Sequence, residues 1–194
     1  ALFLGDGCKG AGLLIQELAE KLNALCVTGP MGKRWIDETH PLYRGVYGFA
    51  GHESAKATIH NENLDLVIAL GAQLGELGTS GWLESPLLSD KLIHVDSTPE
   101  HFTRSPMARL HVCGKIPEIC QRILKSLKNA DEWGYQREQD FHQMSPAINI
   151  NKKTNRTALD LSSKPLIILL IGICLCSFTH CHQAVRLRIV GYKV

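Results

Sequence analysis

The sequence has little excess of charge of either sign. Its 194 residues carry 21 Lys and Arg against 19 Asp and Glu, a formal net charge of +2 at pH 7. A nucleic-acid-binding domain usually carries a strongly basic face, so this balance predicts no nucleic-acid partner. A hydrophobic content of 44% and a charged content of 21% are ordinary for a globular protein with one buried core.

The chain also lacks a secretory signal at its start and a regular cysteine framework. Its seven cysteines stand at positions 8, 26, 113 and 120 and then at 174, 176 and 181. An odd number in this irregular arrangement predicts no disulfide framework and a reducing compartment, so we expect a cytoplasmic protein. The first residue is Ala1 rather than Met, within an expected strand. We interpret this as a sign that further sequence precedes it.

What the chain does contain is a central apolar run followed by a glycine-rich segment. Leu66 to Leu70 is continuously apolar and is closed by Gly71. Such a run is typical of a strand that is buried on both faces of a parallel sheet. Because ligands of open parallel sheets lie beyond the carboxyl ends of the strands, residues 71–81 lie where a small molecule would be held.

The rest of the first 128 residues alternates strands and helices. Further strands are expected at 1–4, 24–27, 91–96 and 110–113, and helices at 14–22, about 52–61 and 116–127. Residues 37–51 are expected to form a polar loop, and 82–88 a covering segment. This alternation predicts an α/β domain with a largely parallel sheet.

The first strand leads into a glycine pattern that has two interpretations. Gly5, Gly7 and Gly10 have the GxGxxG spacing of a dinucleotide-binding loop, in which backbone amides approach a phosphate. The second strand, however, ends at Thr28, where that motif requires a carboxylate for the ribose. This disfavours NAD, and the glycines equally suit a plain turn between strand and helix. Asp96, at the end of a later strand, either binds a ribose or caps the following turn.

Four motifs in order resemble the central domain of thiamine diphosphate-dependent enzymes of the acetolactate synthase, pyruvate oxidase and benzoylformate decarboxylase group. Together they cover residues 1 to about 128 in the family's order and spacing. The motifs are Thr28-Gly29-Pro30-Met31-Gly32-Lys33, His40-Pro41-Leu42-Tyr43-Arg44-Gly45 with Gly48-Phe49-Ala50-Gly51, Asp65-Leu66-Val67-Ile68-Ala69-Leu70-Gly71-Ala72, and Ile93-His94-Val95-Asp96.

The resemblance implies a three-layer, Rossmann-like α/β domain with a mostly parallel sheet of about six strands. It also implies two flanking domains that together bind thiamine diphosphate and magnesium, and neither has a counterpart in this sequence. We therefore expect residues 1–128 to be the central, mainly structural domain of a 2-oxo acid decarboxylase or carboligase, inactive alone. Its expected partners are the two missing domains, in a parent enzyme that forms a homo-oligomer.

No residue is predicted to be catalytic or to bind a metal. Gly5-Asp6-Gly7 looks like the family's magnesium motif, but that motif needs an asparagine about two dozen residues later, and residues 29–35 contain none. His40, His52 and His94 have no acid or nucleophile spaced with them. We expect these three to be loop or surface histidines.

The resemblance also bears on flavin binding, because some family members hold FAD in the central domain. Its implied cofactor-binding positions include Gly71, Ala72, Gln73 and Asp96, besides Gly5, Gly7 and Gly10. Gln73 stands where the flavin-binding members have an arginine, and glutamine cannot replace the fixed charge of a guanidinium. FAD is therefore possible but disfavoured. The alternative function is a stand-alone Rossmann-like domain that binds FAD or NAD.

The character of the sequence changes after residue 128. Residues 129–165 are polar and predict a linker, and 166–194 form an apolar, Cys-rich tail. Leu166 to Phe178 has 13 residues, short of the about 20 that a membrane span needs. The tail's Cys and His residues do not have a usual zinc spacing. We favour the interpretation that the tail is translated out of frame, because the family pattern stops after Pro165. Two other interpretations remain. The tail is a membrane anchor, or it ligates a metal ion through Cys174, Cys176, His180, Cys181 and His182.

Overall fold

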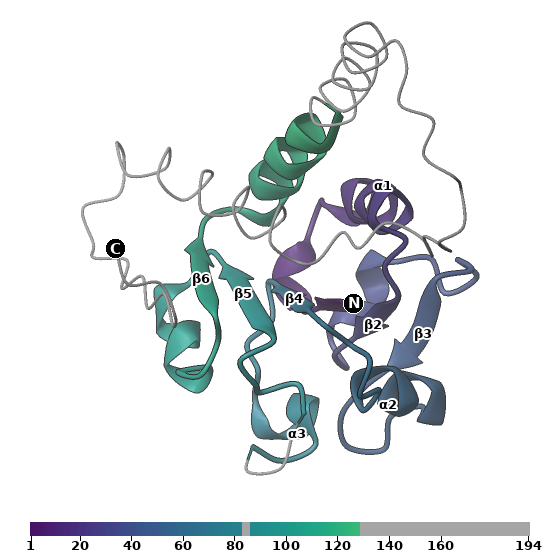
Figure 1. Ribbon diagram of the computed structural model, residues 1–194, viewed down its shortest axis with the longest axis vertical. Coiled ribbons are helices and arrows are strands. Elements are labelled where there is room, and N and C mark those ends of the chain that lie inside the picture. Colours follow the sequence, from purple (N-terminus) through teal and green to yellow (C-terminus); the bar gives the residue numbers. More distant parts are fainter. Residues whose placement is uncertain (83–85, 129–194) are drawn as a thin grey trace, which may run out of the picture.

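The computed structural model describes residues 1–82 and 86–128, which form a layered α/β domain (Figure 1). Its centre is a six-stranded sheet in the order β3-β2-β1-β4-β5-β6, and every neighbouring pair is parallel. The predicted Rossmann-like α/β fold is confirmed, with a fully parallel sheet. The strands are β1 (Leu2–Leu4), β2 (Cys26–Thr28), β3 (Tyr43–Val46), β4 (Val67–Leu70), β5 (Leu92–Asp96) and β6 (Leu110–Cys113).

The strands in the middle of the sheet are buried along their whole length. All residues of β1, β4 and β5 are buried, because helices cover both faces of the sheet. This explains why β4 is a continuous apolar run in the sequence rather than an alternating one. A run of this kind was the signal that predicted the strand.

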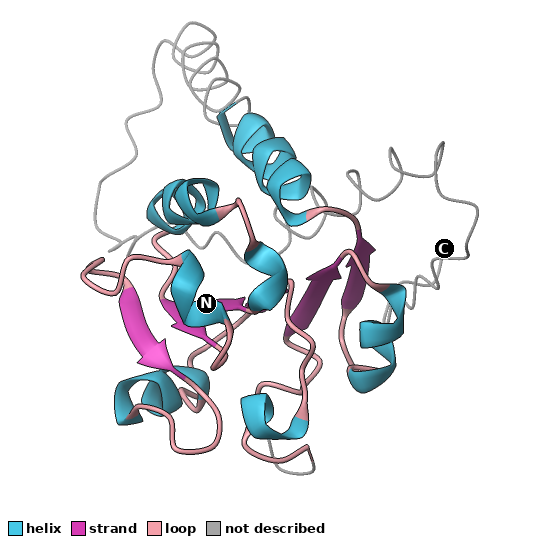
Figure 2. Cartoon of the chain, turned by 180° about the vertical axis from the view of Figure 1, so that it is seen from behind, coloured by secondary structure: helices cyan, strands magenta, loops and turns pink. Residues whose placement is uncertain are grey.

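The helices divide between the two faces of the sheet (Figure 2). On one face, α1 (Gly12–Leu22) and a helix at residues 116–128 share a core with the side chains of Leu2, Leu4, Ile68 and Leu70. On the other face, α2 (Glu53–Ile59) packs with Phe3, Val27, Val67 and Ala69. The shorter helices are α3 (Glu76–Thr79) and the 3₁₀ segments η1 (Asp6–Cys8), η2 (Gly32–Trp35) and η3 (Pro99–Arg104).

One element of the sheet contradicts the sequence prediction. Residues 37–51 were expected to be a loop, but they contain β3, which pairs with β2. This strand lies at the edge of the sheet and is only partly buried, so its sequence Tyr-Arg-Gly-Val has no continuous apolar run. A strand at the edge of a sheet is less buried than a central one and needs fewer apolar residues. The sequence of β3 therefore lacks the continuous apolar run from which the other strands were predicted.

Several predictions fall outside the described residues. These are the linker at 129–165, the tail at 166–194 with its Cys and His cluster, and residues 83–85 of the predicted covering segment. Among the helices of residues 1–82 and 86–128, none has both the length and the apolar character needed to cross a membrane.

Candidate functional site

The strand order reverses between β1 and β4, and in this class of fold a ligand is expected where the loops after two such strands part. In this chain the two loops touch instead. The amide of Gly5 donates to Leu70 O at 2.9 Å, and the amide of Gly7 donates to Gly71 O at 2.9 Å. These are the amides that a dinucleotide-binding loop would offer to a phosphate, and here protein carbonyl oxygens occupy them.

The glycines of this junction permit a close approach of main chains. A Cβ atom on Gly5 would lie 2.1 Å from Gly71 O, and one on Gly71, whose φ is +55°, would lie 2.6 Å from the carbonyl carbon of Gly7. Gly32, in the loop after β2, is equally close, because its Cβ would lie 2.0 Å from Leu4 O. Three loops therefore pack on one another through glycine. Gly10, by contrast, has φ +76° and nothing within 4 Å of its Cβ position.

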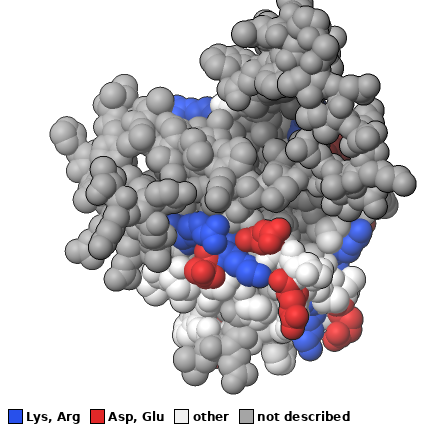
Figure 3. Space-filling model, viewed as in Figure 1, with Lys and Arg blue, Asp and Glu red and all other residues white. Residues whose placement is uncertain are grey.

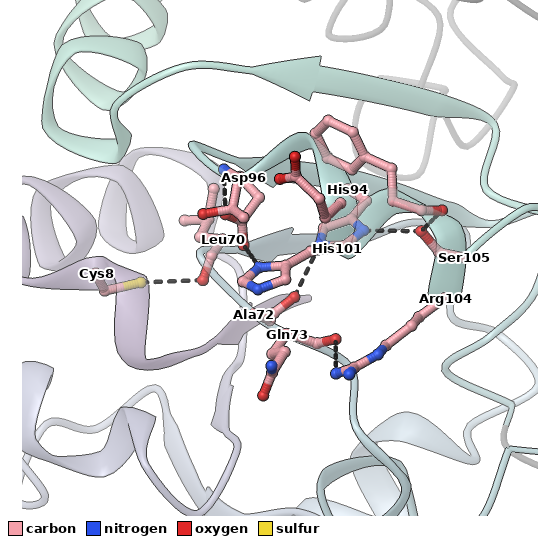
Figure 4. Close-up of polar contacts among 12 residues, drawn as sticks. Cys8, Leu70, Ala72, Gln73, His94, Asp96, His101, Arg104 and Ser105 are labelled. Carbon is pink, nitrogen blue, oxygen red and sulfur yellow. Dashed lines mark hydrogen bonds and ion pairs between the residues drawn. The ribbon is translucent and has the colours of Figure 1, made fainter.

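The carboxylate of Asp96, at the end of β5, is buried and has a partner on each oxygen (Figure 4). Oδ1 accepts the Thr98 amide at 2.8 Å, and Oδ2 lies 3.0 Å from Nδ1 of His101. Asp96 thus caps the turn that follows its strand, one of the two roles that the sequence left open. Both of its oxygens are engaged within the protein.

Gln73 lies exposed just after the junction, and an arginine from elsewhere in the chain reaches it. Nη1 of Arg104, at the end of η3, donates to Gln73 O at 3.2 Å (Figure 4). The preceding carbonyl, that of Ala72, accepts from Nε2 of His94 at 2.8 Å. The predicted site residues 71, 72 and 73 are therefore tied to β5 and η3 by their main chain.

His94 was expected to be a loop or surface histidine, and this prediction was wrong. It lies within β5 and is completely buried. Because Ala72 O only accepts, the proton of a neutral His94 is on Nε2, and Nδ1 accepts the Ser105 hydroxyl at 2.8 Å. Burial lowers the pKa of His94 to about 4, so the ring is neutral. The signal that was missed is its place between Ile93 and Val95 in an apolar run.

Three other histidines, at positions 111, 40 and 52, also have hydrogen-bond partners within the domain. His111 Nε2 lies 2.9 Å from Ser105 O and 3.1 Å from its hydroxyl, so it donates to the same serine. His40 and His52 lie outside helices and strands, as expected, with His40 beside Glu20 and His52 accepting the Val46 amide. None of these arrangements places a nucleophile on the surface, because Ser105 is fully buried.

Cys8, Cys26 and Cys120 are free thiols buried in the core, and Cys113 is half-buried. Burial raises the pKa of Cys8, Cys26 and Cys120 to about 12, so these thiols stay protonated and unreactive. The thiol of Cys8 donates to Leu70 O at 3.1 Å, which adds a further contact to the loop junction (Figure 4). Within the described residues, no three His, Cys, Asp or Glu side chains gather closely enough to hold a metal ion.

Sequence reasoning missed a surface groove between α2 and α3, which we call the α2–α3 groove. Its volume is about 580 Å³, and it is formed by the loop after β3, the outer side of α2, and α3 with the residues after it. These segments are about 25 positions apart in the chain, so no local pattern brings them together. The lining includes Tyr47, Phe49, Glu53, Lys56, Glu76 and Leu77.

On the face shown in Figure 3, the described acidic and basic side chains are interspersed. Exposed ion pairs, such as Lys33 with Glu38 and Lys128 with Glu17, likewise bring opposite charges together on the surface. The described surface in this view presents no broad field of one sign, in keeping with the balanced composition.

Comparison with known proteins identifies the family to which this domain belongs. The family described as the central domain of thiamine pyrophosphate enzymes matches residues 1–123. An acetolactate synthase large subunit of Cyanidium caldarium is 32% identical over 114 residues, which are 59% of this chain and 19% of that protein. An acetolactate synthase of Arthrospira platensis is 30% identical over 127 residues, which are 64% of this chain and 22% of that protein. The chain thus spans only about a fifth of the length of these relatives, and it belongs to the thiamine pyrophosphate enzyme family, whose central domain it contains.

Proposed function

We propose that this chain is the central, mainly structural domain of an acetolactate synthase-like enzyme that decarboxylates or ligates 2-oxo acids with thiamine diphosphate and magnesium. The observation that carries the proposal is the family match over residues 1–123. The six-stranded parallel sheet and the close packing of the loops after β1 and β4 support it, because main chain rather than open space lies at the junction where a ligand would be expected. Its role is to hold neighbouring domains in position.

The residues that the structure describes do not fit thiamine diphosphate or its metal ion. The cofactor supplies a thiazolium ylid that stabilises a carbanion, and it needs a magnesium site with carboxylate or carbonyl oxygens. Residues 1–82 and 86–128 contain no group of three His, Cys, Asp or Glu side chains that could hold a metal ion, and Asp6 of the Gly-Asp-Gly sequence lies exposed on η1. We therefore assign cofactor binding to two further domains as partners, in a homo-oligomeric enzyme of the cytoplasm.

A nucleotide-binding role is the alternative function. The predicted positions Gly5, Gly7, Gly10, Gly71, Ala72, Gln73 and Asp96 all lie at the carboxyl edge of the sheet, which favours it. Against it stand the engaged amides of Gly5 and Gly7, the engaged carboxylate of Asp96, and the uncharged Gln73. We propose that the domain keeps the nucleotide-binding type of fold without requiring a flavin.

A thermal-shift experiment on the 194-residue chain separates these functions. A ligand present at 100 times its Kd stabilises a protein by about 2.7 kcal/mol, which raises Tm by several degrees for a domain of this size. We expect no shift with thiamine diphosphate and magnesium, FAD, NAD or ADP. A shift with FAD or NAD favours the alternative function, and a shift with thiamine diphosphate alone contradicts a purely structural domain.

The enzymatic part of the proposal needs the protein as its gene encodes it. We expect that protein to release CO₂ from a 2-oxo acid only when thiamine diphosphate and a divalent cation are added. The control omits the cofactor and adds the cation alone. A gene product that contains this domain but never consumes a 2-oxo acid would contradict the proposal.

A further inference from the structure

Residues 47–51 lie between β3 and α2, and all five line the α2–α3 groove. Two hydrogen bonds run in opposite directions between the residues on either side of this loop. The Val46 amide donates to Nδ1 of His52 at 2.9 Å, and the His52 amide donates to Val46 O at 2.7 Å. We call these two hydrogen bonds the loop base. One of the two depends on a histidine ring.

The loop base lies on the outer side of the sheet. β3 is at the edge of the sheet that residues 1–82 and 86–128 form, so the start of α2 covers it in place of a further strand. Next to the loop base, Ser54 Oγ donates to Arg44 O at 2.6 Å. Proteins commonly cover an edge strand in this way, because its open polar groups would otherwise pair with other chains.

A glycine of β3 makes room for the ring. A Cβ atom on Gly45, whose φ is +101°, would lie 2.4 Å from Nδ1 of His52 and 2.9 Å from its Cγ. The ring therefore lies directly against the main chain of the strand, where only glycine admits it.

The direction of the ring's hydrogen bond fixes its protonation. Because the Val46 amide can only donate, Nδ1 of His52 accepts, and the proton of the neutral ring is on Nε2. A ring that carries both protons would set an Nδ1–H group against the amide N–H. Protonation therefore breaks this hydrogen bond and leaves the main-chain bond from His52 to Val46 O as the only bond of the loop base.

Solvent reaches this ring, because His52 is exposed, whereas His94 is fully buried. A histidine ordinarily changes its charge between pH 5 and 8. Protons from solvent can therefore reach His52 without any prior opening of the domain.

The charged groups on the two elements that pack around the ring are Arg44 on β3 and Glu53 and Lys56 on α2, and residues 47–51 carry no charge. Nη1 of Arg44 donates to two main-chain carbonyl oxygens, at 2.8 and 3.0 Å. His52 itself takes part in none of the ion pairs that occur among residues 1–82 and 86–128.

We propose that His52 is a pH-sensitive switch for the loop at residues 47–51. The neutral ring closes the loop base, and the protonated ring opens it. The contact of the loop with α3, in which the Phe49 amide donates to Leu77 O at 2.7 Å, weakens when the base opens. The shape of the α2–α3 groove thus depends on pH. The switch concerns this domain alone, so its failure would leave the proposed function unaffected.

Amide hydrogen exchange of the 194-residue chain tests the switch, because it reports local opening residue by residue. Each rate is corrected for the intrinsic effect of pH and expressed as a protection factor. Between about pH 7.5 and about pH 5 we expect the protection factor of the Val46 amide to fall about fivefold, the ratio that about 1 kcal/mol for one hydrogen bond gives. That of the Phe49 amide should fall with it. The Cys26 amide, which donates to Leu42 O at 2.8 Å in the same pair of strands, is the internal control and should not change.

Three variants separate the ring from other titrating groups. His52→Asn keeps an acceptor, because the side-chain oxygen of asparagine stands as many bonds from Cα as Nδ1 does, and it does not titrate. We expect this variant to protect the Val46 amide equally at both pH values. His52→Ala removes the acceptor, so protection should be low at both. His40→Asn is the matched control, because Nδ1 of His40 also accepts an amide, at 3.3 Å, and the pH dependence at Val46 should remain.

Equal protection of the Val46 amide at the two pH values in the wild type would overturn the inference. So would a pH dependence that survives in His52→Asn, because another group would then cause it. A parallel loss at the Cys26 amide would show that acid opens the whole pair of strands. A Phe49 amide that stays protected would show that the loop stays closed, and either of these results also overturns the inference.

Discussion

The loop junction at β1 and β4 and the α2–α3 groove both lie at the carboxyl edge of the sheet, and both depend on glycines for close contact. At the junction, glycine removes the side chains and the main chain fills the space. At the α2–α3 groove, Gly48 lets the loop after β3 touch α3, while the side chains of Phe49 and Leu77 are exposed. The comparison teaches that the exposed side chains, rather than the number of glycines, distinguish the open part of this edge from the closed part.

The largest effect is expected from closing the space at the junction. Gly5→Ala places a Cβ atom 2.1 Å from Gly71 O, while the φ of −105° at Gly5 itself suits alanine. Main-chain atoms cannot rotate away, so we expect a loss of about 3 kcal/mol or more in the free energy of unfolding. Urea denaturation measures it.

Gly10→Ala is the matched control for that substitution. Its Cβ position is open, so only the left-handed φ of +76° is penalised, by about 1 to 2 kcal/mol. If Gly5→Ala costs no more than Gly10→Ala, then the junction is not packed as described. The space beside Gly5 would then be open to a ligand.

This pair of glycines also shows why the sequence could not distinguish the two interpretations of its GxGxxG pattern. A phosphate and a neighbouring loop both require a position without a Cβ atom, so the same residue type serves either. Only the three-dimensional contact of Gly5 with Gly71, 66 positions later, shows that main chain fills the space. The strand β4 was predictable because its signal is local and continuous. The groove was not, because it joins loops that are far apart in the chain.

The second effect concerns pH and the histidine behind the junction. The pKa of His94 falls from 6.5 to about 4 on folding because the ring is buried. The folded state thus binds fewer protons than the unfolded state below pH 6.5. Stability is complete above that pH and is lost as the pH falls toward 4, by about 3 kcal/mol at 1.36 kcal/mol per pKa unit.

Urea unfolding at a series of pH values checks this dependence. In His94→Gln most of the slope between pH 6.5 and 4 should disappear, and a smaller part should remain because burial also lowers the pKa of His111. An unchanged slope in the variant would show that His94 titrates freely. In that case the loop after β4 is more open than its contact with Ala72 implies.

A third, smaller effect is expected from the serine that joins the two histidines. Ser105→Ala removes the hydroxyl that donates to Nδ1 of His94 at 2.8 Å and leaves a buried ring nitrogen without a donor. Such a loss costs about 1 to 3 kcal/mol. Ser54→Ala removes an exposed hydrogen bond of 2.6 Å to Arg44 O and should cost less than about 1 kcal/mol. Thermal unfolding of the two variants compares them, and equal losses would contradict a sealed network.

The smallest effect is expected at the α2–α3 groove, which is the open side of this comparison. Phe49→Ser removes a ring that is 76% exposed, and Leu13→Ser removes a side chain that is 83% exposed. Both should change the free energy of unfolding of the 194-residue chain by no more than about 0.5 kcal/mol, because neither side chain packs in a core. Urea denaturation measures this. A substantial loss for Phe49→Ser alone would mean that the ring of Phe49 is buried within this chain and that the groove is closed in solution. A small loss at both positions would show that the ring of Phe49 adds little to the stability of the fold, as its exposure implies.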